Sequence, residues 1–295
     1  MHHFKRFFIS FFLAYLALAL MLSAWQLVTD SAPNTPAIAW FGSLLSNATI
    51  LFFFVSLFLR KPARTSEHPL PITLLSATGV IVTMMQSQGS HQQPGTAFWL
   101  AAIGFIAWII YLRWYSRSPI PSLPHLKPGK NLPGFQVIKG DGQVLTSQEC
   151  INKKYLWLFY RGNWCPLCVG QVQEVAAQWR ELDAMGVEIM LVSPQPQTHT
   201  QALAKRFKTP MTFLHDPHNQ AAQRLGIAAP GSLPFGLELL GYEPDVVLPT
   251  IIISDEQGKI RYAHISDNYR VRPEPKVLID RLRSSATQET EVNYH

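Results

Sequence analysis

Two of the three cysteines lie two residues apart in FYRGNWCPLCVGQV, residues 159–172. This stretch follows a compact apolar run, YLWLFY, which predicts a buried strand, and it leads into apolar residues at helical spacing. A helix start offers unpaired backbone N–H groups and a partial positive charge, and both favour a thiolate. The pattern therefore predicts a redox-active pair, Cys165–Cys168, where a strand leads into a helix.

The positions around the pair indicate separate roles. Cys165, at the exposed helix entrance, is the expected nucleophile, and Cys168, one turn further along, would resolve the mixed disulfide. Pro166 suits an early helical position, because its missing N–H costs little there. We expect Trp164 to shield the pair and to form part of a docking surface. A zinc site would need four ligands and there is no second CxxC, so we predict no metal and interpret Cys150 as a partly buried bystander.

A second feature is Leu248-Pro249-Thr250, at the entrance of the apolar run VVLPTIII. A proline that opens a central strand is unusual. It indicates either a tight, cis Leu248–Pro249 bond or an ordinary strand-start proline, and the local sequence leaves both open.

The region after residue 134 alternates strand and helix patterns. In chain order we expect a hairpin around Asp141-Gly142, a strand at 155–160, a helix at 166–185, a strand at 187–193, a helix at 201–207, a strand at 211–216, a helix at 219–225, two strands within 250–265 and a helix at about 275–283. This order predicts an α/β domain over 134–284 with a central mixed sheet. Residues 116–133 are rich in proline and predict an extended linker, and 285–295 predict a disordered tail.

The first third of the chain has a different composition. Apolar stretches at about 7–27, 38–59, 70–86 and 96–114 predict a membrane domain over 1–115 with about four transmembrane helices. Three spans, with the third segment buried or re-entrant, is the alternative. The spans hold no cysteine, and their one charged residue is Arg113 at the end of the fourth, so an anchor is favoured over a transport pathway.

The formal net charge of +6 could suggest nucleic-acid binding, but the basic residues gather at the ends of the apolar segments. Loops rich in Lys and Arg alternate with loops that have none. By the positive-inside rule, this alternation predicts an integral membrane protein, of a bacterial inner membrane, with both termini and the α/β domain in the cytoplasm. We expect a lipid bilayer as a partner and no nucleic acid.

Three stretches, LPGFQVIKGDGQVLTSQE, LWLFYRGNWCPLCVGQV and LPTIIISDEQGKIRYAHI, together resemble the redoxin branch of the thioredoxin-like superfamily. The match is to its peroxiredoxin-like alkyl hydroperoxide reductase/thiol-specific antioxidant family, over about residues 128–284. The resemblance implies a thioredoxin fold, catalytic Cys165 and Cys168, and a cis-proline at Pro249 facing them.

The chain departs from the typical peroxiredoxin pattern, which is Pro, three residues, Thr or Ser, two residues, then the peroxidatic Cys. Arg161 falls on the Pro, Cys165 on the Thr and Cys168 on the peroxidatic Cys. Pro249 holds the place of the family's arginine beside the peroxide. The nucleophile is therefore Cys165 if the domain works like thioredoxin and Cys168 if it works like a peroxiredoxin; we favour Cys165.

The leading hypothesis is a membrane-anchored thiol–disulfide oxidoreductase. Its Cys165–Cys168 pair would cycle between dithiol and disulfide without metal or organic cofactor, supported by Arg161, Trp164, Pro166, Pro249 and Thr250. The substrate would be a protein disulfide or a hydroperoxide, the reductant a thioredoxin or glutathione, and loop 226–245 a substrate surface. The alternatives are an antioxidant thiol peroxidase with Cys168 as the peroxidatic thiol, and a non-catalytic membrane-tethered interaction module.

Overall fold

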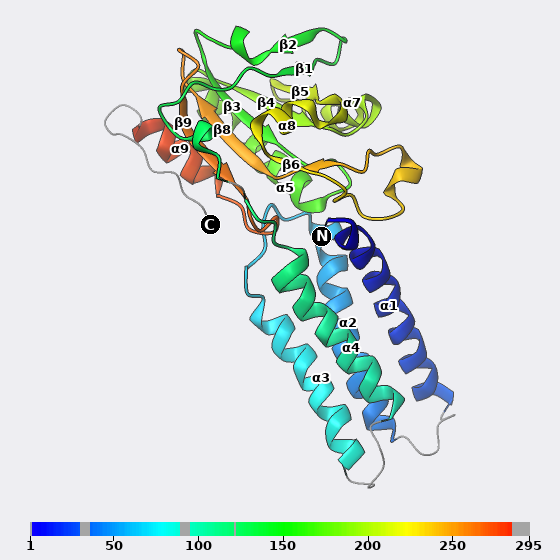
Figure 1. The fold of residues 1–295 in the computed structure, drawn as a ribbon. Helices are drawn as coiled ribbons and strands as arrows, with labels where there is room; N and C mark the ends of the chain where they lie inside the picture. Colours follow the sequence, from blue (N-terminus) through cyan, green and yellow to red (C-terminus); the bar gives the residue numbers. More distant parts are fainter. Residues whose placement is uncertain (1, 30–35, 89–94, 121, 285–295) are drawn as a thin grey trace. The chain divides into compact units, whose positions relative to one another are not determined.

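The computed structural model describes residues 2–29, 36–88, 95–120 and 122–284 (Figure 1). The predicted disordered tail at 285–295 lies outside these residues. The chain divides into two compact units. The helical unit comprises Phe4–Arg60 and Ser66–Arg117, and the α/β unit comprises Met1–His3, Lys61–Thr65 and Ser118–His295.

The helical unit contains the four helices that the sequence predicts: α1 (His2–Thr29), α2 (Ala37–Arg60), α3 (Leu70–Gln88) and α4 (Thr96–Ile110), which continues into one π-helical turn, Tyr111–Tyr115. Of the described helices, three have stretches long and apolar enough to cross a membrane: Phe4–Thr29, Ala37–Arg60 and Thr96–Tyr115. The apolar stretch of α3, Leu70–Gln86, is shorter. Length and composition therefore qualify three helices as spans.

Small residues bring α2 and α3 together. A Cβ atom added at Gly42 would lie 2.8 Å from the carbonyl oxygen of Gly79, so the two backbones are in direct contact there. One turn along α2, the hydroxyls of Ser46 and Ser76 hydrogen-bond at 2.9 Å. Close backbone approach and hydroxyl pairing are typical of helix packing in an apolar solvent, where burial of apolar surface gives no driving force.

The α/β unit is built on a seven-stranded sheet with the order β2-β1-β5-β4-β3-β8-β9 (Figure 1). Its strands are β1 (Gln136–Ile138), β2 (Val144–Thr146), β3 (Lys154–Phe159), β4 (Val187–Ser193), β5 (Met211–His215), β8 (Thr250–Ser254) and β9 (Ile260–Ile265). The pairs β3–β4 and β4–β5 are parallel, and the other pairs are antiparallel. The predicted mixed sheet is confirmed. A separate ribbon joins β6 (Ala228–Ala229) to β7 (Val246–Val247).

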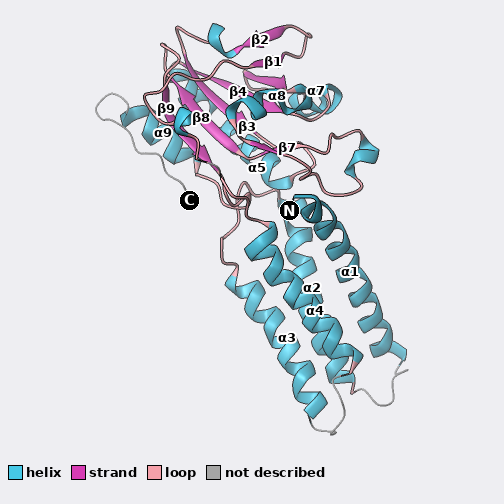
Figure 2. Cartoon of the chain, in the orientation of Figure 1, coloured by secondary structure: helices cyan, strands magenta, loops and turns pink. Residues whose placement is uncertain are grey.

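The helices of this unit are α5 (Pro166–Ala177), α6 (Trp179–Ala184), α7 (Gln197–Ala204), α8 (Gln220–Leu225) and α9 (Pro275–Ser284) (Figure 2). The single helix predicted at 166–185 breaks at Gln178, whose φ of −97° and ψ of 6° leave the helical region. A parallel β3–α5–β4 unit followed by an antiparallel β8–β9–α9 unit is the thioredoxin-like arrangement that the sequence predicts.

Strand β3 lies inside the sheet, between β4 and β8, and is buried on both faces. Trp157 and Phe159 join the core cluster that also contains Leu225 of α8. Leu158 and Tyr160 alternate to the opposite face and are fully buried. Because β3 is packed on both faces, its end fixes the position of the turn that leads to the cysteine pair.

The proline-rich segment at 116–133 differs from the extended linker that the sequence predicts. Leu123 and Leu126 are buried in the core cluster of the sheet. The backbone N–H of Gly129 donates to the carbonyl of Ile260 at 2.8 Å, so the segment runs along the start of β9. The leucines between the prolines supply apolar surface, and burying that surface holds the segment against the domain.

The resemblance implies a cis Leu248–Pro249 bond, and this prediction is wrong. None of the described peptide bonds is cis, so Leu248–Pro249 is trans. Pro249 directly precedes β8, and its carbonyl accepts a hydrogen bond from Ser266 at 3.0 Å. A proline in this place lacks only an N–H that the strand does not need. The ordinary strand-start alternative is therefore the correct one.

Candidate active site

The start of α5 places the two cysteines. Cys165 is the N-cap residue, with φ −90° and ψ 111°, and Pro166 is the first helical residue, as predicted. The carbonyl of Cys165 accepts hydrogen bonds from the backbone N–H of Cys168 at 3.0 Å and of Val169 at 3.1 Å. Gly162 enables the turn out of β3, since its φ of 148° lies in a region that favours glycine.

Both sulfurs are buried. Cys165 is 2% exposed and Cys168 is fully buried, and the Cys165 thiol donates a hydrogen bond to the Cys168 sulfur. The expectation of an exposed Cys165 is therefore wrong. The physical reason is that the connection after β9 folds over the start of α5, where Arg272 donates to the carbonyl of Leu167.

Arg272 is the cation that contacts the pair. It is buried, and one terminal nitrogen donates to the Cys168 sulfur at 3.3 Å. The other donates to Gln171 Oε1 at 2.6 Å and to the Leu167 carbonyl at 3.3 Å, while Nε donates to the Tyr269 carbonyl at 3.1 Å. With every nitrogen of the fork engaged, the guanidinium is held in one orientation.

These contacts shift the pKa values of the two thiols in opposite directions. Burial opposes ionisation of Cys168, but the hydrogen bond from Cys165, the guanidinium of Arg272 and the charge of Arg161 outweigh it and hold the pKa of Cys168 well below its ordinary value. The same hydrogen bond, together with burial, raises the pKa of Cys165 well above its ordinary value. The two shifts have opposite directions, so the surroundings favour a thiolate on Cys168 over one on Cys165.

The predicted supporting residues Arg161 and Trp164 lie together. Arg161 is 8% exposed, and its guanidinium lies 4.8 Å from the ring centroid of Trp164 and 4.9 Å from that of Tyr269. One of its nitrogens donates to the carbonyl of Ser232 at 3.0 Å. Two aromatic faces thus hold a second positive charge near the sulfurs.

The loop at 226–245 lies beside the pair, as predicted. Besides Ser232, it contributes Tyr242, whose hydroxyl donates to Asn163 Oδ1 at 2.5 Å. The ring of Tyr242 stacks on that of His199, with centroids 4.5 Å apart. The loop is therefore fastened to the turn that carries the cysteines.

A buried amide completes the surroundings. Gln195 accepts a hydrogen bond from the backbone N–H of Asn163 at 2.8 Å and donates to the hydroxyl of Tyr160 at 3.1 Å. Burial, and then the charge of Cys168, raise the pKa of Tyr160, so this phenol stays neutral.

Pro249 and Thr250 lie at the end of β8 that adjoins the end of β3, where Thr250 pairs with Phe159. The hydroxyl of Thr250 donates to the carbonyl of Leu248 at 2.9 Å rather than to a cysteine. Both residues therefore shape the neighbouring strand entrance, and a direct contact with the sulfurs is not among their described hydrogen bonds.

Cys150 lies elsewhere. It is buried in the core cluster on the Trp157 face of the sheet. Burial, and then Glu188 and Glu149, raise its pKa to about 11. A thiol in this environment is inert at neutral pH, which agrees with the bystander interpretation.

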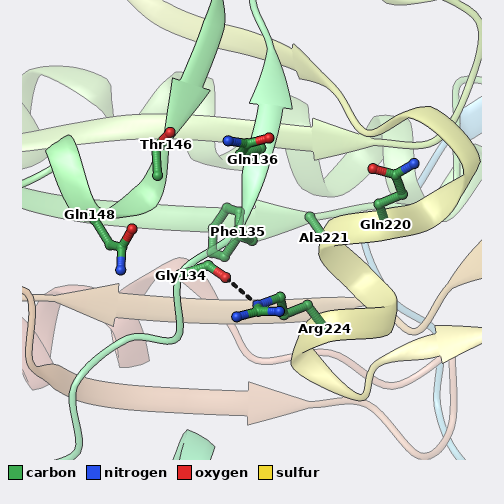
Figure 3. Close-up of a pocket in the computed structure, with 8 residues that line it drawn as sticks. All are labelled: Gly134, Phe135, Gln136, Thr146, Gln148, Gln220, Ala221 and Arg224. Carbon is green, nitrogen blue, oxygen red and sulfur yellow. Dashed lines mark hydrogen bonds between the residues drawn. The ribbon is translucent and has the colours of Figure 1, made fainter.

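A surface pocket lies away from the cysteines, between the β1–β2 hairpin and α8 (Figure 3). Its lining residues are Gly134, Phe135, Gln136, Thr146, Gln148, Gln220, Ala221 and Arg224. Arg224 Nε donates to the carbonyl of Gly134 at 2.7 Å. With one cation and no nucleophile in its lining, this pocket does not offer the chemistry of the cysteine site.

Sequence reasoning missed the residue that contacts Cys168 most directly. Arg272 lies in NYRVRPEP, after the last strand, where two arginines alternate with apolar or neutral residues. The sequence held one clue, because Pro249 stands where the family has an arginine. A buried thiolate then needs a cation from elsewhere in the chain, and the arginines after β9 were candidates.

Comparison with known proteins agrees with this geometry. Residues 128–263 match the model of the AhpC/TSA family. A Haemophilus influenzae protein named as a peroxiredoxin, bcp, is 24% identical over 159 residues, which are 54% of this chain and 97% of that protein. Chloroplastic peroxiredoxin Q of Populus jackii is 26% identical over 108 residues, which are 36% of this chain and 51% of that protein.

Among solved structures, peroxidoxin BcpB of Mycobacterium tuberculosis matches with a TM-score of 0.44 and 17% identity, covering 56% of this chain and all (100%) of that one. Reduced Prx3 of Vibrio vulnificus in complex with H₂O₂ matches with a TM-score of 0.47 and 16% identity, covering 52% of this chain and 97% of that one.

The family match falls on the part of the chain that holds the cysteine pair. The match and the relatives confirm the resemblance that the sequence indicates and the expectation of an oxidoreductase. The α/β unit has a thioredoxin-like arrangement of strands and helices and resembles the AhpC/TSA family over residues 128–263.

Proposed function

We propose that this chain is a thiol peroxidase in which Cys168 is the nucleophile and Cys165 the resolving thiol. The observation that carries the proposal is the buried Arg272 guanidinium, 3.3 Å from the sulfur of Cys168. A cation held at this sulfur favours its thiolate, and the thiolate is the form that attacks a peroxide. This reverses the preference for Cys165 drawn from the sequence.

Burial supports a peroxide over a protein disulfide as the substrate. A disulfide in a folded protein is attached to a bulky backbone that must come close to the attacking sulfur. Here both cysteine residues are at most 2% exposed. A hydroperoxide needs to bring only two oxygen atoms to Cys168. The thiol–disulfide oxidoreductase alternative would require the turn around Trp164 to open before reaction.

The proposed cycle uses sulfur chemistry alone. The Cys168 thiolate attacks one peroxide oxygen; an S–O bond forms, the O–O bond breaks, and the leaving oxygen takes up a proton to give water or an alcohol. Cys168 is then a sulfenic acid. The Cys165 sulfur attacks it, an S–S bond forms, and the hydroxyl leaves with a proton as water. A dithiol reductant such as thioredoxin, or two molecules of glutathione, supplies two electrons and restores both thiols.

We also propose that the helical unit anchors the enzyme in a lipid bilayer, with both termini and the α/β unit in the cytoplasm. Three helical stretches of sufficient length support the anchoring. The alternation of basic and uncharged loops supports the cytoplasmic side for both termini, and this arrangement requires that the shorter α3 also crosses, so that the number of spans is even. The enzyme would then meet hydroperoxides formed in or near the membrane.

The experiment that tests the proposal is stopped-flow oxidation of the reduced full chain in detergent micelles. We would follow tryptophan fluorescence after mixing with hydrogen peroxide, a lipid hydroperoxide or a small disulfide-bonded protein. Rapid oxidation by a peroxide that persists in Cys165→Ser and disappears in Cys168→Ser supports the proposal. Reaction mainly with the protein disulfide, trapped on Cys165 in Cys168→Ser, would establish the reductase alternative instead.

A further inference from the structure

We propose that the segment Lys61–Thr65 is a component of the cysteine site and that Arg64 is a positioning residue, which holds Arg272 against Cys168. In sequence this segment connects α2 to α3, yet it belongs to the α/β unit. The inference rests on the proposed function, because it concerns the group that stabilises the Cys168 thiolate.

The segment lies directly on α5, behind the cysteines. A Cβ atom added at Gly170, two residues after Cys168, would lie 2.2 Å from the carbonyl oxygen of Lys61 and 2.7 Å from the backbone nitrogen of Ala63. Contact this close between two backbones is possible only because residue 170 is glycine. Lys61 itself has a φ of 47°, a conformation that costs energy for a non-glycine residue and persists when its surroundings fix it.

Arg64 joins this helix to the connection that carries Arg272. Its two terminal nitrogens form a bidentate pair with the carboxylate of Glu174 on α5. Its Nε donates to the backbone carbonyl of Arg272 at 3.1 Å, and a terminal nitrogen donates to that of Pro273 at 3.3 Å. A single guanidinium therefore binds both α5 and the backbone of the connection that carries Arg272.

The neighbouring residue adds a second tie. The backbone N–H of Thr65 donates to the carbonyl of Arg270 at 2.9 Å, and the guanidinium of Arg270 donates to the Thr65 hydroxyl at 3.2 Å. Between β9 and α9 the chain forms no regular helix or strand, and its first residues are held by backbone hydrogen bonds such as that from Ser266 to the carbonyl of Pro249 at 3.0 Å. Arg64 and Thr65 add contacts at Arg270, Arg272 and Pro273, the part of the connection that carries the Arg272 side chain.

The side chain and the backbone of Arg272 are therefore held by different residues. Its side chain is oriented by Gln171 and Cys168, and its backbone by Arg64. Electrostatic stabilisation depends on a charge held in place before the reaction, so loosening the backbone weakens the stabilisation without removing the charge. The connection between two apolar helices thus becomes part of the chemistry of the α/β unit.

The test measures the pKa of Cys168 in the full chain in detergent micelles. Cys150→Ser and Cys165→Ser are built into every variant, so that iodoacetamide reports Cys168 alone, and the alkylation rate is followed against pH. Arg64→Met is expected to raise the apparent pKa by about one unit, so that the thiolate fraction at acidic pH falls about tenfold. Arg64→Lys keeps the positive charge but cannot form the bidentate pair. We expect its apparent Cys168 pKa to lie between those of the parent and of Arg64→Met.

Two further variants keep the result interpretable. Gly170→Ala displaces the segment from α5 without changing the Arg64 side chain itself, and it is also expected to raise the pKa of Cys168. Arg283→Met breaks an exposed ion pair with Glu181 in the same unit and is expected to keep the parent profile. Lower thermal stability in Arg64→Met with an unchanged Cys168 profile would overturn the inference, since a merely structural role predicts that outcome. A parent Cys168 that titrates like an ordinary thiol would overturn the proposed function as well.

Discussion

Arg272 and Cys168 define the site at the scale of single residues. The guanidinium is buried with the sulfur, and every nitrogen has an acceptor, so the charge is neither screened by solvent nor free to move away. Cys165 donates its proton toward the same sulfur. The position of the Thr in the typical peroxiredoxin pattern is thus held by a thiol, which donates toward Cys168 and, in the proposed cycle, resolves the oxidised product.

Replacing Arg272 by Met tests the cation. The thiolate of Cys168 would lose its charged partner while the volume of the side chain is nearly conserved. We expect the rate of oxidation by hydrogen peroxide at pH 7 to fall by about 10²–10³-fold, with Arg272→Lys intermediate. Stopped-flow fluorescence of each variant gives the rates. A loss of less than about threefold would mean that the cation does not matter to the reaction.

The pH profile provides a separate test of the pair. Because the pKa of Cys168 lies well below that of an ordinary thiol, the peroxide reaction should already be at its plateau at pH 7. The rate should fall only when the pH drops through the lowered pKa. In Arg272→Met the fall should begin at higher pH. If the rate of the parent protein still rises between pH 7 and 9, neither cysteine is fully ionised at pH 7, which would contradict the lowered pKa of Cys168.

At the scale of elements, a βαβ unit fixes the turn that carries the cysteines. The strands and helices of this unit were largely predictable, because YLWLFY and VEIMLVS are compact apolar runs and the helix between them has a regular period. The burial of Cys165 was not predictable in this way. It depends on Arg272, which lies more than a hundred residues away in sequence, and local periodicity carries no record of that contact.

The start of α8 offers a test of stability against pH. The buried carboxylate of Asp216 accepts hydrogen bonds from the backbone N–H groups of Ala221 and Ala222, and burial raises its pKa from 3.8 to about 6. The folded state therefore binds the proton more tightly than the unfolded state. The stability this provides is fully present below pH 3.8 and is lost as the pH rises through about 6, up to about 3 kcal/mol in total.

Asp216→Asn removes this titration and retains one acceptor for the helix start. We expect the melting temperature of the parent chain relative to Asp216→Asn to decrease between pH 4 and 6 and to level off above that range. Differential scanning fluorimetry of the two proteins in the same detergent provides the comparison. A difference that increases with pH would mean that the carboxylate is stabilised by its two N–H donors more than it is destabilised by burial.

At the scale of the whole chain, two units of different composition follow one another. The apolar stretches and the α/β pattern were both visible in the sequence, because each depends on residues close together in the chain. The assignment of Lys61–Thr65 to the α/β unit was not visible. That segment has the basic, proline-containing composition of a membrane loop, and only the fit of its backbone against Gly170 reveals its place.

The proposed membrane placement predicts the side on which each loop lies. Fusions to alkaline phosphatase and to a green fluorescent protein after residue 295 should give low phosphatase activity and high fluorescence. A fusion within residues 30–35 should give the reverse. High phosphatase activity at the C-terminal fusion would place the α/β unit in an oxidising compartment and contradict the cytoplasmic assignment.

If Cys168 attacks the peroxide, its first product is a sulfenic acid on Cys168, which chemical trapping detects. The reduced Cys165→Ser chain is treated with one equivalent of hydrogen peroxide in the presence of dimedone, which labels sulfenic acids, and the labelled residue is identified by mass spectrometry. We expect a dimedone adduct on Cys168 and, in Cys168→Ser, no comparable adduct on Cys165. An adduct that forms on Cys165 at the parent rate would contradict attack by Cys168.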